Sequence, residues 1–311
     1  MGSNCSCYGK FRLSRSNEEL EIINIENEQM DAKKNQGNSF QLTEESYKCE
    51  WPSVTEKAKI AEKKLGRFVW NSDEDQQLGK PVKSNEGWTY IGKLDGLGKR
   101  SGPGVFFWED GSKYIGYWKD GKANGRGRLI HADGDVYEGD WVDDKAQGKG
   151  RYIHFEGSSY EGEWFEDKQH GYGFEIWNDG AYYKGNYSCG LKHGFGEFYW
   201  ADKSAYKGEF LLNNINGKGK YIWNDGREYE GDWKDNRMHG RGKFIWPDGR
   251  CYIGDYYMDK KHGYGEFTWP NGTKYIGQWC EGVQNGKGTY INELGVPREG
   301  EWIKGKCVKF T

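Results

Sequence analysis

Three residues near the N-terminus have the types and spacing that suit covalent lipid attachment. The chain begins Met1-Gly2-x-x-x-Ser6, the pattern in which Gly2 is myristoylated after Met1 is removed. One myristoyl chain holds a protein at a membrane only marginally, so stable anchoring needs a second signal. Cys5 and Cys7 are close enough to supply it by S-palmitoylation. The sequence therefore predicts lipid attachment at Gly2, Cys5 and Cys7.

A short basic stretch supports this prediction without being sufficient for it. Lys10, Arg12 and Arg15 precede the first acidic residue, Glu18. Each basic residue adds about 1 kcal/mol near an anionic membrane surface, which is too little for stable binding without an anchor. The alternative is that the motif arises by chance and that both cysteines are ordinary thiols.

Patterns typical of catalysis are missing from the rest of the chain. It contains neither Gly-x-Ser-x-Gly nor His-Glu-x-x-His. Gly96–Ser101 matches a phosphate loop only weakly, because Arg100 occupies the hydroxyl position and Lys93 replaces a required glycine. We therefore expect no catalytic residue, no cofactor and no enzymatic activity.

Histidines that recur along the chain do not predict a metal site. Four of them precede Gly-x-Gly pairs, at His170, His193, His239 and His262. Asparagine fills the same slot at Asn124, Asn216 and Asn285. Neighbouring histidines would lie two strands, or roughly 10 Å, apart, which is too far to share one ion. We expect a loop role for them and no metal.

Composition indicates a thin and repetitive architecture. Of 311 residues, 35% are hydrophobic and 30% charged, with 48 glycines, 15 tryptophans and 22 tyrosines. That apolar share is below the usual 45–50%.

The net charge of −3 argues against nucleic acid as a partner. Neither a run of about 20 apolar residues nor the apolar core of a signal peptide is present. Seven scattered cysteines favour a reducing, cytosolic setting.

A unit of 23 residues repeats through most of the chain. Tyr-x-Gly-x-aromatic recurs at this spacing from Tyr114 to Tyr275, with an earlier copy at Tyr90 and a worn copy at Arg298. Each unit also contains Gly-x-Gly, and most contain Asp-Gly or Asn-Gly. Asp-Gly between alternating runs is a strong hairpin signal, because the tight turn needs positive φ. Each unit is therefore predicted to be a β-hairpin, and Asp202-Lys203 is the internal unit that lacks the turn glycine.

Side chains of the two strands should separate by face, since residues alternate sides along a strand. Tyr229, Gly231 and Trp233 share one face, and acidic residues of first strands face basic residues of second strands on the other. Such cross-strand pairs contribute about 0.2–1 kcal/mol each. Phe174 and Glu175 reverse the usual order, which predicts a local bulge or an altered face.

The repeat resembles the MORN family (membrane occupation and recognition nexus) over roughly residues 88–302. The resemblance rests on Tyr-x-Gly-x-Trp, Gly-x-Gly-x-aromatic and Asp-Gly within 23 residues, in about ten copies. It implies an all-β fold, an elongated, single-layer, twisted antiparallel sheet of successive β-hairpins. Ends of such an array need caps.

Residues before the repeats are expected to form an arm and a cap. Residues 1–50 are polar and lack periodicity, which indicates disorder. Residues 51–87 are expected to hold a short helix at about 53–65, opened by a Ser53-x-x-Glu56 capping box and ended by Gly66. We expect this helix to dock on the first hairpin; the alternative is a detached partner-binding helix. Gly66–Trp70 is predicted to be an orphan edge strand, followed by a loop and the array at 88–311.

The resemblance implies a non-catalytic scaffold at a membrane–cytoskeleton junction. Its location would be cytoplasmic and peripheral to the plasma membrane or a ciliary or organelle membrane, and some family members dimerise. Exposed rings of the repeats are the expected surface for protein partners: Trp118, Trp141, Trp164, Tyr187, Trp233, Tyr256 and Trp279. Stacking on neighbouring glycines is the alternative role of each ring.

Three other functions remain open. Repeats of this family are often credited with binding anionic phospholipid, although the basic strands here alternate with acidic ones. A cilium-associated structural role, similar to radial-spoke proteins of the axoneme, is the second. Regulation of an enzyme in trans is the third.

Overall fold

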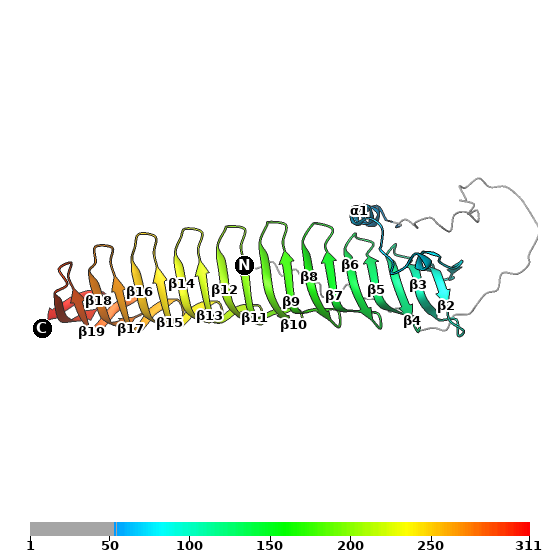
Figure 1. Ribbon diagram of the computed structural model, residues 1–311. Helices are drawn as coiled ribbons and strands as arrows, with labels where there is room; N and C mark the ends of the chain where they lie inside the picture. The colour runs from blue at the N-terminus through cyan, green and yellow to red at the C-terminus, as the bar shows by residue number, and fades with distance from the viewer. Residues whose placement is uncertain (1–52, 54) are drawn as a thin grey trace, which may run out of the picture. The chain divides into compact units, whose positions relative to one another are not determined.

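The computed structural model describes residue 53 and residues 55–311, in two compact units. The first ends at Lys168 and the second comprises Gln169–Thr311. The arm at 1–50, with Gly2, Cys5 and Cys7, lies outside the described residues. Within each unit, antiparallel strands joined by hairpins follow one another in a single layer (Figure 1). The predicted antiparallel sheet of successive hairpins with one short helix is confirmed.

The described residues of the first unit form one α-helix, one short 3-10 helix and eight strands. These are α1 (Glu56–Leu65), η2 (Asp73–Gln76), β1 (Pro81–Lys83), β2 (Thr89–Leu94), β3 (Arg100–Phe107), β4 (Lys113–Lys119), β5 (Lys122–Ile130), β6 (Val136–Val142), β7 (Lys145–Ile153) and β8 (Ser159–Phe165).

From β9 to β20 the strands alternate between nine and seven residues, and β21 has five. They are β9 (Lys168–Ile176), β10 (Tyr182–Ser188), β11 (Leu191–Tyr199), β12 (Ala205–Leu211), β13 (Asn214–Ile222), β14 (Glu228–Lys234), β15 (Arg237–Ile245), β16 (Cys251–Tyr257), β17 (Lys260–Thr268), β18 (Lys274–Cys280), β19 (Val283–Ile291), β20 (Pro297–Ile303) and β21 (Lys306–Phe310).

Glycines set the register of each hairpin. Gly231 of β14 lies opposite Gly219 of β13 and Gly242 of β15. The register shifts after Gly231, which places an irregularity at this point of the hairpin. The turns use positive φ as predicted, for example at Gly226 (φ 85°). Lys203, in the unit that lacks a turn glycine, adopts φ 73° and keeps the same turn.

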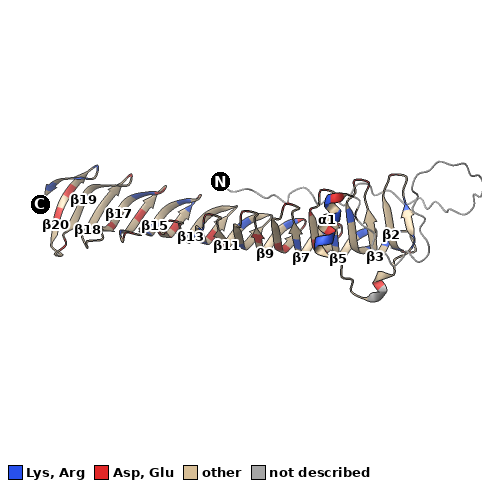
Figure 2. Ribbon diagram, turned by 90° about the horizontal axis from the view of Figure 1, so that it is seen from above, with Lys and Arg blue, Asp and Glu red and all other residues tan. Residues whose placement is uncertain are grey.

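Each sheet layer has two distinct faces. We call the face that carries Tyr229, Gly231 and Trp233, with the equivalent residues of other repeats, the aromatic face. The opposite side, which carries Glu230 and Asp232, is the charged face. Both signs of charge follow the strands of each unit (Figure 2). The predicted alternation is confirmed by ion pairs such as Arg128 with Glu138 at 2.7 Å.

The N-terminal edge of the first unit differs from the prediction. Gly66–Trp70 is not a strand; β1 pairs with β2 and forms the edge instead. Phe68 packs on the charged face against Val105 and Ile115. Phe68 and the partly buried Trp70 therefore pack against the face of the sheet, and the segment needs no partner strand.

The N-cap of helix α1 lies two residues later in the chain than expected. Thr55 is its N-cap, and the Thr55 hydroxyl accepts a hydrogen bond from the Ala58 N–H at 3.2 Å. Ser53, predicted as the cap, instead donates from its N–H and hydroxyl to Glu62 at 2.9 and 2.8 Å. The helix ends at Gly66, where φ is 71°, as predicted.

The helix docks on the charged face, but not on the first hairpin as expected. Ala58 and Ala61 pack against Ile130 of β5 and Val136 of β6. These two positions are apolar here, so they give the small helix side chains a surface to bury. An ion pair between Glu62 and Lys113 lies beside this contact.

We expect Glu62→Gln to loosen α1. Burial by itself raises the pKa of Glu62, but Lys113 and the hydrogen bonds from Ser53 outweigh it and hold the pKa below its ordinary 4.5. The Lys113 side chain is only 2% exposed. Removing its carboxylate partner should destabilise the docked helix by about 1–3 kcal/mol. Hydrogen exchange of residues 56–65 would report this.

Acid should mimic the substitution. A carboxyl group whose folded pKa is depressed stabilises the fold above its unfolded pKa and loses that contribution as pH falls through the folded value. The helix of the wild type should therefore exchange faster as pH drops below 4.5, after correction for intrinsic rates. Equal pH dependence in Glu62→Gln would contradict the assignment.

Candidate functional site

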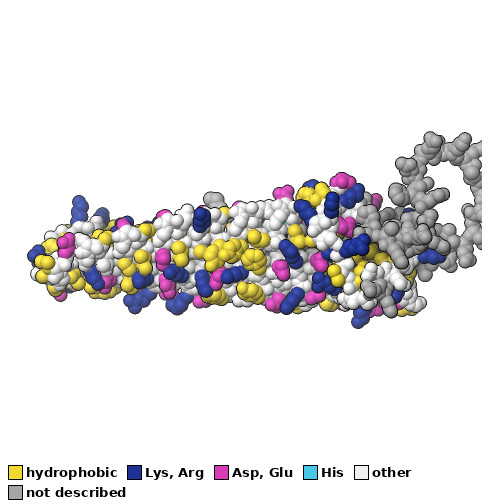
Figure 3. All heavy atoms as spheres, turned by 45° about the horizontal axis from the view of Figure 1, so that its top comes forward, with side chains coloured by type: hydrophobic (Ala, Val, Ile, Leu, Met, Phe, Trp, Pro, Cys, Tyr) yellow, Lys and Arg dark blue, Asp and Glu magenta, His cyan; other side chains and the backbone are white. Residues whose placement is uncertain are grey.

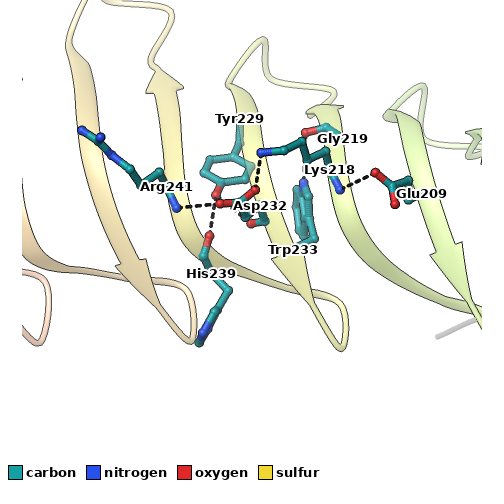
Figure 4. Close-up of polar contacts among 8 residues, drawn as sticks. All are labelled: Glu209, Lys218, Gly219, Tyr229, Asp232, Trp233, His239 and Arg241. Carbon is teal, nitrogen blue, oxygen red and sulfur yellow. Dashed lines mark hydrogen bonds and ion pairs between the residues drawn. The ribbon is translucent and has the colours of Figure 1, made fainter.

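The interior of the aromatic face is built from tyrosine, tryptophan and glycine. The Tyr229 hydroxyl donates to the Asp232 carbonyl at 2.9 Å, and its ring meets Trp233 edge-on at 5.0 Å (Figure 4). Trp233 Nε1 donates to the Gly219 carbonyl at 3.1 Å. The glycines leave room for the rings, because a side chain at Gly242 would collide with Tyr229. First-strand rings thus pack on the sheet's own backbone.

The seven rings predicted to contact partners all belong to this interior. Their exposed fractions are 4% for Trp118, 1% for Trp141, 2% for Trp164, 3% for Tyr187, 6% for Trp233, 5% for Tyr256 and 6% for Trp279. This corrects the expectation that they are exposed anchors. Each ring is covered by neighbouring glycine backbone and tyrosine side chains, so almost no surface of it is left for a partner to contact.

A second set of tryptophans lies closer to solvent and was missed by the sequence analysis. We call Trp177, Trp200, Trp223, Trp246 and Trp269 the outer tryptophan row. Each is half-buried and recurs every 23 residues. Their backbones close the Asp-Gly type turns; Trp223, for example, accepts from the Gly226 N–H at 3.0 Å. The signal was a tryptophan three residues before the turn glycine, or before Lys203 in the unit that lacks this glycine.

The outer tryptophan row and the second-strand rings form one run of ring contacts. Phe198 lies 5.2 Å from Trp177 and 4.4 Å from Trp200. The same alternation continues to Trp269, with neighbouring centroids 4.3–5.6 Å apart. Such an array gives the second unit a wide, rigid apolar surface.

Indole N–H groups distinguish the two sets of tryptophans. Inner tryptophans donate to glycine carbonyls, as Trp141 and Trp279 do at 3.2 and 3.1 Å. Within residues 169–311, no indole of the outer row has a hydrogen-bond partner, and that of Trp177 is buried. The other four indole N–H groups of the row are therefore available to another molecule.

The Phe174–Glu175 reversal exchanges the faces on which these two side chains lie. The pairing of β9 with β10 stays regular and has no bulge there. Glu175 pairs regularly with Tyr183, and Phe174 with Lys184. Glu175 takes the place of a ring on the aromatic face, where it is 5% exposed. The Tyr187 hydroxyl donates to it at 2.8 Å, and Lys192 Nζ lies 3.1 Å away. A buried ion pair thus interrupts the rings.

Phe174 is turned to the charged face in exchange. It is 41% exposed and lies 5.7 Å from Tyr182, which stacks on Tyr199 at 4.5 Å. Ile176 is 36% exposed nearby on the same strand. Figure 3 shows hydrophobic side chains gathered between charged ones on the face it presents. The second unit therefore carries a smaller apolar patch opposite the tryptophans.

Charges on the charged face are locally neutralised. Lys218 Nζ lies 2.8 Å from Asp232, and the Arg241 N–H donates to the same carboxylate at 2.9 Å (Figure 4). Burial raises the pKa of Asp232, but these contacts outweigh it and lower the pKa. The interleaving of signs leaves no continuous basic surface along β13–β15.

Chemistry-bearing clusters are few among the described residues. Across residue 53 and residues 55–311, no three His, Cys, Asp or Glu side chains are arranged to hold a metal. The recurring histidines lie in second strands and not in loops, with His239 opposite Asp232 and His262 opposite Asp255. None of the described helices has the length and hydropathy to cross a bilayer.

The repeat, its register and its two faces define a class of β-hairpin repeat proteins. The MORN repeat model matches nine consecutive segments: 97–113, 114–136, 137–159, 160–182, 183–205, 206–226, 229–249, 252–274 and 275–292. The chain belongs to the MORN-repeat family, a family of repeat scaffolds with membrane-associated members. The copies at Tyr90 and Arg298 lie outside these matches, although β2 and β20 continue the hairpin pattern.

Comparisons with curated proteins and solved structures identify no close relative of this chain. No curated protein matches the chain. The TCP10 domain of Danio rerio CPAP, in complex with a peptide of STIL, is 13% identical with a TM-score of 0.41, covering 71% of this chain and 98% of that domain. The SAS-4 TCP domain of Drosophila melanogaster, with a proline-rich motif of Ana2, is 11% identical with a TM-score of 0.32, covering 61% and 96%. These values are too low to assign a function.

Proposed function

We propose that this protein is a non-catalytic MORN-repeat scaffold, held at the cytoplasmic face of a membrane by acyl chains on Gly2, Cys5 and Cys7. It presents the outer tryptophan row of residues 169–311 to an extended or helical segment of a protein partner at a membrane–cytoskeleton junction. The observation that carries the proposal is the row of half-buried rings whose indole N–H groups, that of Trp177 apart, are unbonded and not buried. Tryptophan is the residue most enriched at interface hot spots.

Protein is favoured over phospholipid as the ligand of the repeats. Lipid headgroups would need a positive surface, whereas basic side chains here pair with carboxylates across the strands. The aromatic face of the second unit is mostly apolar, with indole N–H donors along one side. A peptide backbone supplies carbonyl acceptors for those donors. Membrane affinity is therefore assigned to the N-terminal arm.

Membrane flotation in cells that acylate proteins tests the anchor. Wild type should float with membranes, and Gly2→Ala and Cys5→Ser/Cys7→Ser should remain in the soluble fraction, because one lipid signal is insufficient. Asn4→Ala is the matched control, since position 4 is unrestricted in the motif. If both variants float like wild type, the repeats or a partner carry the membrane affinity. If wild type itself does not float, a cytoskeletal or axonemal location is favoured.

Substitution of the outer tryptophans tests the docking surface. We expect peptides selected on the full chain from a random displayed library to lose at least tenfold affinity with Trp223→Ala or Trp246→Ala, as for hot-spot residues. Trp108→Ala, at the equivalent position of the first unit, is the matched control for ring removal. Fluorescence polarisation measures each affinity. Peptides insensitive to both substitutions would place the docking surface elsewhere.

A further inference from the structure

One position of the repeat places its side chain on the aromatic face, beside a first-strand ring, and its residue type varies from repeat to repeat. It lies near the start of each second strand; Lys192 faces Tyr187, and Lys261 faces Tyr256. Its occupants at 23-residue spacing are Arg100, Ala123, Ala146, Gln169, Lys192, Ile215, Met238, Lys261 and Gln284. In the second unit, therefore, this position carries a cation at Lys192 and at Lys261.

Lys192 shows how the chain itself satisfies a cation in this environment. Its ammonium lies 4.9 Å from the centroid of Trp177 and 5.1 Å from that of Tyr183. The Glu175 carboxylate, from the preceding second strand, lies 3.1 Å away. Rings and a carboxylate together replace the water that the ammonium loses.

Lys261 has the rings but lacks the carboxylate. Its ammonium lies 4.3 Å from the centroid of Trp279 and 4.6 Å from that of Phe267. The position that corresponds to Glu175 is Phe244, three repeats later. Within the described residues, no carboxylate lies within ion-pair distance of Lys261.

Burial and charge around Lys261 both disfavour an unpaired ammonium. Burial and, to a smaller extent, the positive charge of Arg250 together lower the pKa of Lys261 to about 8. A pocket of about 200 Å³ opens beside the ammonium, lined by Lys261, Phe267, Trp269, Trp279, Val283 and Gln284. It adjoins the C-terminal end of the outer tryptophan row, so a segment bound along that row can reach it.

We propose that this pocket binds the carboxylate of an aspartate or glutamate side chain from the protein partner that docks on the outer tryptophan row. The inference rests on the proposed function and adds to it one fixed acidic residue in the partner. The incoming carboxylate would take the role that Glu175 has for Lys192, while Trp269 and Trp279 enclose its methylene groups. Charge-assisted hydrogen bonds of this kind are stronger than neutral ones.

A peptide selection on the intact chain tests this inference. A random displayed library is selected on wild type, and affinities of the enriched peptides are measured by fluorescence polarisation. We expect the enriched peptides to share Asp or Glu at one position, and Asn or Gln at that position to weaken binding at least tenfold. Lys261→Gln should weaken the acidic peptide to the same extent and leave the amide peptide unchanged, because the two changes remove one shared contact.

Repeats of the same chain provide well-matched variants. Gln169 and Gln284 occupy the equivalent position, so Lys261→Gln should fold normally. Phe244→Glu should place an internal carboxylate beside Lys261, as Glu175 lies beside Lys192, and thereby block the acidic peptide. Lys260→Gln is the charge control, since Lys260 pairs with Glu281 outside the pocket.

Each outcome separates this inference from the proposed function. Enriched peptides that depend on Trp246 but share no acidic residue would overturn the inference and leave the docking surface in place. Acidic peptides equally weakened by Lys260→Gln and Lys261→Gln would also overturn it, because long-range attraction would explain them. If no peptide is enriched, or none depends on the outer tryptophan row, the docking proposal fails and the inference fails with it.

Discussion

Lys192→Ile should lower the free energy of unfolding of the second unit by about 3–5 kcal/mol, although isoleucine is apolar and fills the same position at Ile215. The cause is the carboxylate that remains. Glu175 is 5% exposed and would keep only the Tyr187 hydroxyl as a donor, at 2.8 Å. An ionised carboxylate in such a place has lost most of its hydration without a compensating charge.

The double variant Glu175→Phe/Lys192→Ile should restore the stability. Phe198 and Ile215 show that the next repeat already uses this apolar combination. Replacing a buried ion pair by apolar residues of similar volume is neutral or stabilising by about 1–4 kcal/mol. Restoration by the second substitution would show that the pair specifies local packing and is not needed for stability.

Chemical denaturation, with hydrogen exchange of β9–β11 as a local probe, measures these variants. Lys184→Ala is the matched control: it removes the charge-face contact of Lys184 with Glu197, where Lys184 is 42% exposed. Exposed pairs contribute about 1 kcal/mol or less. The argument is wrong if Lys192→Ile costs no more than Lys184→Ala, or if the double variant is as unstable as the single one.

The hairpins could be predicted because their signals are local. The spacing of 23 residues, the Gly-x-Gly pairs and the Asp-Gly turns fix strand, register and turn without long-range information. Even Lys203 follows the pattern, because its neighbours on both sides impose the turn. The reversal at Phe174 and Glu175 was also readable, since alternation alone places the carboxylate among the rings.

Burial could not be predicted from the repeat alone. Trp233 and Trp223 both recur every 23 residues and both lie on the aromatic face, yet one is 6% exposed and the other half-buried. The difference arises because Trp233 is covered by rings of neighbouring repeats, whereas Trp223 lies at the turn, beyond the last cross-strand glycine. Sequence shows which residues face the same side; packing between repeats decides which of them a partner can reach.

The contacts of helix α1 could not be predicted from its own sequence, because they are made with residues far along the chain. Thr55 and Ser53 are equally suited to cap a helix by residue type. The choice is settled by partners far along the chain, since the Thr55 hydroxyl also donates to the Ala132 carbonyl at 2.7 Å. Docking on Ile130 and Val136 likewise depends on position along the array: Ile130 has isoleucine equivalents in most repeats, whereas the equivalents of Val136 include Lys113, Ser159 and Glu228.

Gly242→Ala should destabilise the second unit by about 3 kcal/mol or more, the upper part of the range for overpacked sites. An added Cβ would lie 2.4 Å from the Tyr229 hydroxyl oxygen and 2.5 Å from two of its ring carbons. The ring cannot move aside, because it is fully buried between Trp233, at 5.0 Å, and Tyr256, at 5.2 Å. Gly242 has no positive φ, so the cost is steric.

Two comparison variants separate packing from backbone conformation. Gly249→Ala changes a turn glycine with φ 88° and no close neighbour, so it should cost only the 1–2 kcal/mol of a left-handed residue. Tyr229→Ala removes the ring that collides with the new Cβ. Its own cost should be about 3–5 kcal/mol.

The double variant Gly242→Ala/Tyr229→Ala gives the decisive measurement. With the ring gone, the added methyl group occupies space that is already empty, so the double variant should be less destabilised than the sum of the single ones by about 2 kcal/mol or more. Strict additivity in chemical denaturation would mean that Gly242 acts through the backbone. Coupling would show that glycine in this repeat serves chiefly to seat the tyrosine, which in turn leaves the outer tryptophans as the rings that a partner can reach.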